Sequence, residues 1–352
     1  MHILDYDLDQ WRGWLENQNQ PSYRAVQIMH WIYKQKCLNA DDMRNIGSET
    51  KGLLKASFSN NLPNIISRHD SNDGTTKWLL QLSSGQHLET VYIPEKNRGT
   101  LCISSQVGCA LACSFCATGL MGLNRNLKTN EIIAQVWLAM REIAPRRITN
   151  VVFMGMGEPL MNCPAVYPAI NILLSDHGFG LSKYRVTVST SGIVPAMLKL
   201  KEHSSCALAV SLHAPNNELR NKLVPINKKY PLELLIDACK NYTQGSEKRH
   251  IMLEYLLIKD VNDQQRHAKE LIHIASQFRS KVNLIPYNTV MGIDYQASPE
   301  ATVREFQKTL QLAGITTTVR KQRGDPIAAA CGQLAGVTAD NTRKTIREIS
   351  ET

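Results

Sequence analysis

The stretch Cys109-Ala110-Leu111-Ala112-Cys113-Ser114-Phe115-Cys116 places three cysteines within eight residues. A zinc site normally uses four protein ligands, commonly one nearby pair and a second pair further along the chain. Here three residues and then two separate the cysteines, and no second Cys or His pair follows at zinc-finger distance. Three thiolates instead suit a four-iron cluster that leaves one iron open for another ligand. The alternative is a structural metal knuckle, which the polar loops described below disfavour.

The remaining cysteines are spread along the chain. Cys102 precedes the three-cysteine loop, and five others are scattered: Cys37, Cys163, Cys206, Cys239 and Cys331. The N-terminus is acidic and lacks the basic start and apolar centre of a signal peptide, and no run of eighteen apolar residues indicates a membrane span. We therefore expect a cytosolic protein with no membrane association, whose thiols stay reduced and whose clustered cysteines bind a ligand.

Strand-like and helical segments alternate after residue 92. Seven segments have strand character: Thr100–Ser104, Asn150–Met154, Tyr184–Ser189, Ala207–Leu212, Ile251–Ile258, Val282–Ile285 and Thr316–Val319. Helical segments lie between them, such as Glu131–Met140, for which Thr129 or Asn130 is the expected cap. This alternation implies parallel strands joined by right-handed crossovers. Periodicity alone leaves open a doubly wound sheet or a full or partial βα barrel.

Polar and glycine-rich segments follow four of these strands. They are Gly155-Met156-Gly157-Glu158-Pro159, Ser189-Thr190-Ser191-Gly192, Ser211-Leu212-His213 and Pro286-Tyr287-Asn288. Singly, each is typical of a turn, a helix cap or a structural histidine. The glycine pair is not a dinucleotide-binding motif, because Leu160 occupies the third glycine position. Since the carboxyl ends of parallel strands meet at one edge of the sheet, the four segments together predict a ligand pocket there.

The first 92 residues have a different character. Residues 23–33 have apolar residues at helical spacing, with Ser22 placed as the cap. Trp78–Leu82 and Leu88–Ile93 have strand character on either side of a short polar turn. We expect a small α+β module here, separate from the larger part of the chain.

The net charge of +9 is unevenly distributed. Residues 1–92 carry nine Lys or Arg and ten Asp or Glu, so the remaining residues carry thirty-one against twenty-one, an excess of +10. Basic pairs recur there, including Arg146-Arg147 and Lys228-Lys229. Such pairs are commonly solvated surface charges, although the excess makes a polyanionic substrate plausible.

A three-cysteine loop after a first strand, with Gly-Glu after the second, resembles the radical S-adenosylmethionine (radical-SAM) superfamily. A narrower resemblance, to the RlmN/Cfr family of adenosine methyltransferases and to its RlmN branch, extends over about residues 20–336. Five segments carry it: Cys102–Cys109, Gly122–Leu127, Phe153–Leu160, Ser211–Pro215 and Ala330–Leu334.

This resemblance implies an α/β fold with a partial (β/α)6-type barrel and a small N-terminal α+β accessory domain that binds RNA. Residues 1–92 would form the accessory domain. Residues 93–336, including the segment around Cys331, would form the catalytic barrel, and residues 337–352 a C-terminal tail.

The family resemblance also implies an activity. Its members methylate C2 or C8 of an adenosine in 23S ribosomal RNA, the RlmN branch acting at C2 and, in some bacteria, on transfer RNA too. Cys331 would take a methyl group from one SAM molecule, and a 5′-deoxyadenosyl radical from a second would remove a hydrogen atom from it. The resulting carbon radical would add to C2, and Cys102 would release the protein–RNA adduct through a transient Cys102–Cys331 disulfide. Glu89 matches the proton acceptor.

Cofactor contacts are implied in the same way. A [4Fe-4S] cluster would be held by Cys109, Cys113 and Cys116, hereafter the cluster cysteines. Residues that match the family's SAM contacts are Gly157, Glu158, Ser189, Ser211, Leu212, His213 and Asn288. The enzyme is expected to be a monomer that uses an electron donor such as flavodoxin.

Two other functions remain open at this point. The chain could be a radical-SAM enzyme for a substrate other than RNA, or a non-enzymatic iron–sulfur protein that binds RNA. The Cys102 and Cys331 pair argues against the first. The second would require a fourth cluster ligand.

Overall fold

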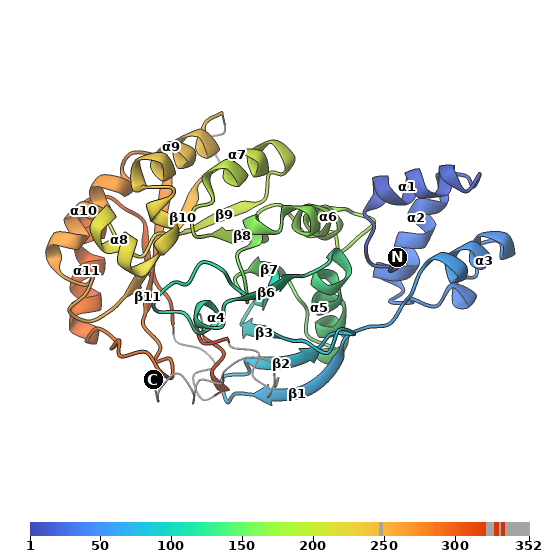
Figure 1. The fold of residues 1–352 in the computed structure, drawn as a ribbon, viewed down its shortest axis with the longest axis horizontal. Helices are drawn as coiled ribbons and strands as arrows, with labels where there is room; N and C mark the ends of the chain where they lie inside the picture. Colours follow the sequence, from blue (N-terminus) through green and yellow to red (C-terminus); the bar gives the residue numbers. More distant parts are fainter. Residues whose placement is uncertain (246–248, 322–326, 331, 335–352) are drawn as a thin grey trace.

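A curved ten-stranded sheet, covered by helices on its outer face, forms the body of the molecule (Figure 1). This computed structural model describes residues 1–245, 249–321, 327–330 and 332–334. The strand order is β1-β2-β3-β4-β7-β8-β9-β10-β11-β12, so the described strands form an open sheet whose two edges do not pair.

Seven parallel strands make the barrel part of this sheet. They are β4 (Arg98–Cys102), β7 (Asn150–Phe153), β8 (Val186–Thr190), β9 (Ala207–Ser211), β10 (Ile251–Leu257), β11 (Ser280–Pro286) and β12 (Thr317–Val319). Neighbours in the sheet follow chain order without the reversal that defines a doubly wound sheet. The structure therefore confirms the partial barrel and all seven predicted strands, with ends shifted by a few residues.

Helices connect the barrel strands along the outside of the arc (Figure 1). The α-helices are α5 (Thr129–Glu142), α6 (Cys163–Leu174), α7 (Val194–His203), α8 (Asn217–Leu223), α9 (Leu232–Thr243), α10 (Gln265–Ala275) and α11 (Glu300–Leu312). Short 3-10 turns, η3 (Pro159–Met161) and η4 (Pro225–Lys228), precede α6 and α9. Their apolar faces and the outward-facing strand residues form one continuous hydrophobic core.

The N-terminal strands extend the same sheet. Strands β1 (Asn64–Asp70), β2 (Thr76–Gln81) and β3 (His87–Glu95) pair antiparallel, and β3 pairs antiparallel with β4. The predicted strands appear as β2 and β3, whereas β1 has mostly exposed residues and no alternating pattern that could have predicted it. The expected domain boundary at residue 92 lies inside β3. The hydrogen bonding of the sheet therefore continues from the N-terminal strands into the barrel across this position.

Three helices precede these strands and pack beside the barrel (Figure 1). They are α1 (Leu8–Asn17), α2 (Arg24–Met29), which continues as a π-helical turn η1 (His30–Lys34), and α3 (Ser48–Ser57), with the 3-10 turn η2 (Ala40–Asp42) before α3. The prediction that Ser22 caps α2 is wrong, because Tyr23 holds the cap position and makes no side-chain bond.

The N-terminal helices are fixed to α5 by long-range hydrogen bonds. Asp5 accepts from the Asn130 amide in the first turn of α5 at 3.0 Å, and the Trp137 indole donates to the Ile32 carbonyl at 3.1 Å. Lys128 occupies the cap position that we assigned to Thr129 or Asn130. The acceptor for this helix start therefore comes from a residue distant in sequence, which a local pattern cannot reveal.

The inner face of the sheet encloses a lumen. Residues facing it alternate along the strands, for example Asn150 and Val152 on β7 and Ala207 and Ala209 on β9. A two-stranded ribbon, β5 (Gln106–Gly108) with β6 (Leu123–Asn126), and the short helix α4 (Ala117–Leu120) lie at the carboxyl edge of the barrel. The cluster cysteines belong to the loop between β5 and α4.

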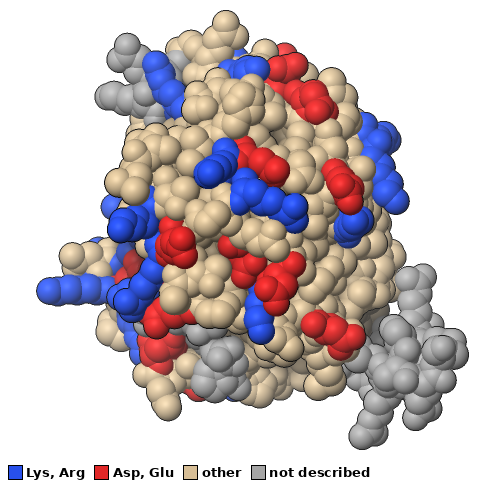
Figure 2. Space-filling model, turned by 90° about the vertical axis from the view of Figure 1, so that its left-hand side faces the viewer, with Lys and Arg blue, Asp and Glu red and all other residues tan. Residues whose placement is uncertain are grey.

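Two surface properties concern possible partners. On the face that carries α10 and α11, lysines and arginines alternate with aspartates and glutamates (Figure 2). This face therefore has no concentration of basic side chains. No helix in the described part of the chain is long and apolar enough to cross a membrane.

Candidate active site

The cluster cysteines line one cavity at the carboxyl edge of the barrel. Their loop is held from two sides. The Cys109 amide donates to the Gly122 carbonyl at 3.0 Å, and the Ser114 amide donates to the Leu223 carbonyl of α8 at 3.2 Å. These bonds fix the backbone that presents the three sulfur atoms to the cavity.

The surroundings of these thiols fit an iron–sulfur cluster. Leu111, Phe115 and Leu223 pack beside them, and burial raises the pKa of Cys109 to about 12 and also raises the pKa of Cys113. A bound cation would be needed to keep such thiols ionised at neutral pH. No three His, Cys, Asp or Glu side chains of the described residues are grouped to hold a single metal ion. Thiolates of a four-iron cluster each bind a different iron, so they need no common point.

Gly155 and Gly157 follow β7 and lie against the loop after β4. A Cβ atom on Gly157 would be 2.5 Å from Cβ of Gln106, and one on Gly155 would be 2.7 Å from Oγ of Ser104. Gly157 also has φ of 98°, in the region that favours glycine. Close backbone approach explains both glycines and lets this loop form one wall of the cavity.

Glu158 joins the loops after β7 and β8. Its side chain is fully buried, and its two oxygens accept from the Ser191 amide at 2.8 Å and the Leu160 amide at 3.1 Å. Its own amide donates to Gln106 Oε1 at 2.8 Å. Burial raises the pKa of this carboxyl group, an effect that the two amide donors oppose. The carboxylate lines the cavity while it fixes the loops that surround it.

Arg220 of α8 joins the loops after β8 and β9. Its guanidinium group donates to the carbonyl oxygens of Ser191 at 2.6 Å, Leu212 at 3.1 Å and Ser211 at 3.2 Å, and to Asn227 Oδ1 at 2.8 Å. Burial lowers its pKa to about 10, so the group stays charged at neutral pH. A single buried side chain therefore satisfies three backbone carbonyls beside the cavity.

His213 presents a fixed hydrogen-bond donor to the cavity. Its Nδ1 atom accepts from the Leu256 amide at 3.1 Å, which places the proton of the neutral ring on Nε2. Burial lowers its pKa to about 3, so the ring is neutral at physiological pH. Phe115 contacts it edge to face, with ring centroids 4.8 Å apart. His213 has φ of 57°, which turns the chain sharply after β9.

The structure brings together most of the predicted cofactor contacts. Five of them line the cavity with the cluster cysteines: Gly157, Glu158, Ser189, Ser211 and His213. Two are not among its lining residues. Leu212 is packed in the hydrophobic core and reaches the site only through its carbonyl group, and Asn288 is buried after β11.

Cys102 and Glu89 face the lumen beyond the cavity. Cys102 pairs in register with Val152, which lines the lumen, and with Val91 of β3. Glu89 is two residues from Val91 and so projects from the same face of the sheet. Both side chains are buried, at 6% exposure.

Lys77 of β2 connects Glu89 to the C-terminal part of the chain. Its Nζ atom lies 2.9 Å from Oε1 of Glu89 and donates to the Ala328 carbonyl at 3.2 Å. The predicted methyl carrier, Cys331, lies outside the described residues. Residues on its other side are bonded to α4, because the Ala117 amide donates to the Gly332 carbonyl at 2.8 Å.

Sequence reasoning missed the residues that support the loops. Gln106 lies in the segment Cys102–Cys109 but has no predicted role, whereas Arg220 and Lys77 belong to no motif, and a single lysine or arginine is normally expected at the surface. The hydrogen bonds of Arg220 join segments that the chain separates, so only the fold identifies its role.

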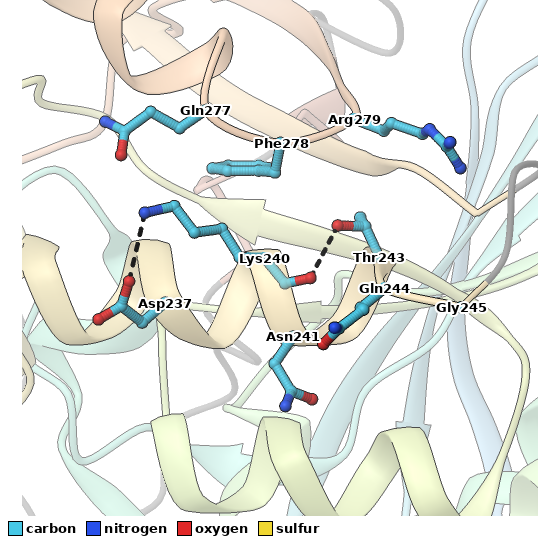
Figure 3. A pocket seen from close by; sticks show the side chains of 9 residues that line it. All are labelled: Asp237, Lys240, Asn241, Thr243, Gln244, Gly245, Gln277, Phe278 and Arg279. Carbon is cyan, nitrogen blue, oxygen red and sulfur yellow. Dashed lines mark hydrogen bonds and ion pairs between the residues drawn. The ribbon is translucent and has the colours of Figure 1, made fainter.

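A second, shallow depression is lined by a different set of residues (Figure 3). It is lined by side chains from the end of α9 and from residues 277–279. Asp237 and Lys240 pair with each other there at 3.4 Å. None of the predicted site residues contributes to it, so it is not the candidate active site.

Comparison with known proteins identifies the family. Residues 103–272 match the Radical SAM superfamily, and residues 1–59 match the family described as the ribosomal RNA large subunit methyltransferase N-terminal domain. A dual-specificity RNA methyltransferase RlmN from Ruthia magnifica subsp. Calyptogena magnifica is 48% identical over 98% of both chains. The chain belongs to the RlmN family of radical-SAM RNA methyltransferases. Radical-SAM enzymes of this kind use a [4Fe-4S] cluster and SAM.

Other RlmN relatives agree over the same length. The RlmN of Alkalilimnicola ehrlichii is 45% identical over 98% of this chain and 96% of that protein. A crystal structure of a radical SAM methyltransferase from Sphaerobacter thermophilus superimposes with a TM-score of 0.89 at 40% identity, covering 96% of this chain and all of the other. The similarity in sequence and in fold therefore covers nearly the full length of this chain.

A substitution at Gly157 should destabilise the protein more than the same substitution at another glycine with a similar positive φ. Gly157→Ala adds a methyl group against Gln106, so we expect it to lower the free energy of unfolding by about 2 kcal/mol and to weaken SAM binding. Gly85→Ala is the matched control, because Gly85 has φ of 84° but open space around it. Urea denaturation and equilibrium dialysis would measure both effects. Equal losses in the two variants would contradict the close-approach explanation.

Removing the guanidinium group of Arg220 should release the loops that surround the cofactor cavity. Arg220→Met removes the guanidinium donor from three buried carbonyls, of which Leu212 still accepts from the Ala214 amide, and we expect SAM affinity to fall at least tenfold. Arg220→Lys keeps the charge but not the planar fork, so its loss should be intermediate. Dialysis with the reconstituted protein measures affinity, and Arg304→Met, on the exposed face of α11, is the control. Unchanged SAM binding by Arg220→Met would show that the loops hold without it.

Proposed function

We propose that this enzyme methylates C2 of an adenosine in 23S ribosomal RNA, and of an adenosine in transfer RNA, using two SAM molecules per turnover. The observation that carries the proposal is one cavity that joins the cluster cysteines to the loops after β7, β8 and β9. Full-length similarity to proteins named dual-specificity RNA methyltransferases supports the RNA substrates.

The cluster cysteines would hold the [4Fe-4S] cluster, which when bound supplies the electron that cleaves SAM. The chain's own residues bind and orient that SAM molecule. Glu158 offers a carboxylate suited to the methionine amino group, and His213 offers a neutral N–H donor. Ser189 and Ser211 add hydroxyl groups at the ends of β8 and β9. The apolar packing of Leu111 and Phe115 restricts water near the cluster loop.

Cys331 would act first as a nucleophile toward the methyl group of SAM. A sulfur–carbon bond forms and S-adenosylhomocysteine leaves. After a second SAM is cleaved, the 5′-deoxyadenosyl radical would take one hydrogen atom from this methyl group, and the remaining carbon radical would add to C2. The adduct would then give up the C2 proton and one electron, which the cluster, when bound, can take back. The Cys102 thiolate would attack the Cys331 sulfur, the bond from that sulfur to the transferred carbon would break, and the carbon would take up a proton to become the methyl group. The resulting disulfide must be reduced by an external thiol before the next turnover.

Described neighbours of Cys331 support this role. Gly332 and Leu334 line the cavity that the cluster cysteines share, and Thr118 of α4 donates to the Leu334 carbonyl at 2.5 Å. Glu89 would accept the proton that C2 loses, and its contact with Lys77 brings that carboxylate beside the same segment of chain.

Partners follow from the chemistry. A reduced flavodoxin would supply electrons, and a cytosolic monomer would meet both RNA classes. The N-terminal residues 1–92 carry little net charge, so we propose that they contact RNA chiefly through shape while basic residues of the barrel neutralise phosphates.

The two cysteines of the methyl shuttle should fail in different ways. Cys331→Ala should produce no methylated RNA, because the carrier is absent. Cys102→Ala should accumulate a covalent protein–RNA adduct, because transfer to C2 proceeds but release does not. Denaturing gel shift and intact-mass measurements distinguish these outcomes. Both variants should retain about four irons per chain.

Cys37→Ala is the matched control, since Cys37 lies among the N-terminal helices. This variant should methylate RNA at the wild-type rate. Normal turnover by Cys331→Ala would contradict the shuttle. SAM consumption without RNA methylation by the wild type would favour a different substrate. Binding of RNA with no SAM consumption would favour the non-enzymatic alternative.

A further inference from the structure

A second cavity continues from the cofactor cavity through the barrel lumen. It has a volume of about 650 Å³, within the range of small-molecule sites. The two cavities share Met154, Glu254 and Arg320 in their walls, so these residues stand at the junction. Apolar side chains such as Val152 and Met252 form much of the wall around them.

A row of polar side chains crosses the sheet at this junction. Ser211 of β9 is in register with Glu254 of β10, Glu254 with Asn283 of β11, and Asn283 with Thr318 of β12. Asn283 donates to Glu254 Oε2 at 2.8 Å and accepts from the Thr318 hydroxyl at 3.0 Å. The row begins at a predicted SAM contact, Ser211, and leads away from the cluster.

Glu254 is the one acidic side chain at this junction among the described residues. It is 6% exposed, and burial raises the pKa of its carboxyl group while the nearby charge of Arg320 opposes the shift. Burying a carboxyl group away from water is costly unless polar partners compensate it. One hydrogen bond from Asn283 offsets only part of that cost, which suggests that the carboxyl group serves a ligand.

The far end of this second cavity has a basic rim. Three cations contribute to it: Arg98, Lys183 and Arg249. Lys183 lies shortly before the start of β8, and Arg249 lies shortly before the start of β10. Both therefore lie at the opposite end of the barrel from the cluster loop. Lysine and arginine side chains at such a rim suit phosphate groups of a nucleic acid, while a base could enter the lumen between them.

An acceptor beside two donors matches one nucleobase in particular. The exocyclic N6 amine of adenine can donate a hydrogen bond to a carboxylate. The ring nitrogen next to it can accept a hydrogen bond from arginine or asparagine. Guanine has an oxygen at the corresponding position, which a carboxylate would repel. Contact at N6 also leaves C2 uncovered, since ring atom N1 separates the two positions.

We propose that Glu254, with Asn283 and Arg320, forms the recognition site for the target adenine, and that the Glu254 carboxylate accepts a hydrogen bond from the N6 amine. This inference rests on the proposed RNA methylation and deepens it. Glu254 then selects the base, while the rim cations bind the backbone. A base held at the junction lies between the second cavity and the cofactor cavity.

A cycle of paired changes in protein and RNA tests this contact directly. The RNA is a hairpin that the wild type methylates at one adenosine, and its partner carries purine riboside, which lacks N6, at that position. With wild type, we expect kcat/KM to fall ten- to hundredfold on the purine hairpin. Glu254→Ala should show a similar loss on the adenosine hairpin and little further loss on the purine hairpin, because both changes remove one interaction.

Three controls separate recognition from a structural role. Glu254→Gln keeps the shape and one acceptor oxygen, so it should recover part of the activity. Formation of 5′-deoxyadenosine without RNA should be unchanged in both variants. Glu300→Ala, on the exposed face of α11, should behave as the wild type does.

The outcomes distinguish this inference from the function on which it rests. Losses that simply multiply across the cycle would overturn the N6 contact while leaving RNA methylation intact. Loss of 5′-deoxyadenosine formation by Glu254→Ala would also overturn it, by placing the side chain at SAM instead. A wild type that methylates neither hairpin nor any other RNA would contradict the proposed function and this inference with it.

Discussion

Polar backbone groups at the carboxyl ends of the barrel strands must be satisfied without water, and this constraint organises the site. The loops after β7, β8 and β9 turn sharply around a cavity and expose carbonyl and amide groups to the protein interior. Arg220 donates to three of those carbonyls, and Glu158 accepts from two of the amides. Because these side chains are buried, their hydrogen bonds hold the loops together around the cavity.

The curvature of the sheet places the two cavities along one axis. Inward-facing residues from successive strands form one lumen, so the cofactor cavity at its carboxyl edge opens onto a second cavity below. Cys102 and Glu89 share the inner face, and Lys77 links Glu89 to the chain just before Cys331. The antiparallel strands β1–β3 extend this face, and Lys77 of β2 donates from it to the Ala328 carbonyl.

Local patterns in the sequence predicted the barrel strands, because each buried strand is a short apolar run bounded by turn residues. They also predicted the cluster loop and most of the cavity-lining residues, which directly follow strands. They failed for the start of α5, where Lys128 holds the cap position and the distant Asp5 accepts from the Asn130 amide, and for the strand β1, whose residues are mostly exposed. They could not reveal Arg220 or Glu254, because burial of a charged side chain depends on the tertiary fold and leaves no periodic signal.

The central claim is that methyl transfer to RNA proceeds through a carbon radical on a methylated cysteine. It is tested most directly with SAM whose methyl group carries three deuterium atoms, followed by mass spectrometry of the 2-methyladenosine produced. The enzyme must first be methylated with the same labelled SAM. Since one hydrogen isotope is removed from the methyl group before the carbon joins C2, we predict a product that retains two deuterium atoms. A product that retains all three would show direct transfer of an intact methyl group and would contradict this account.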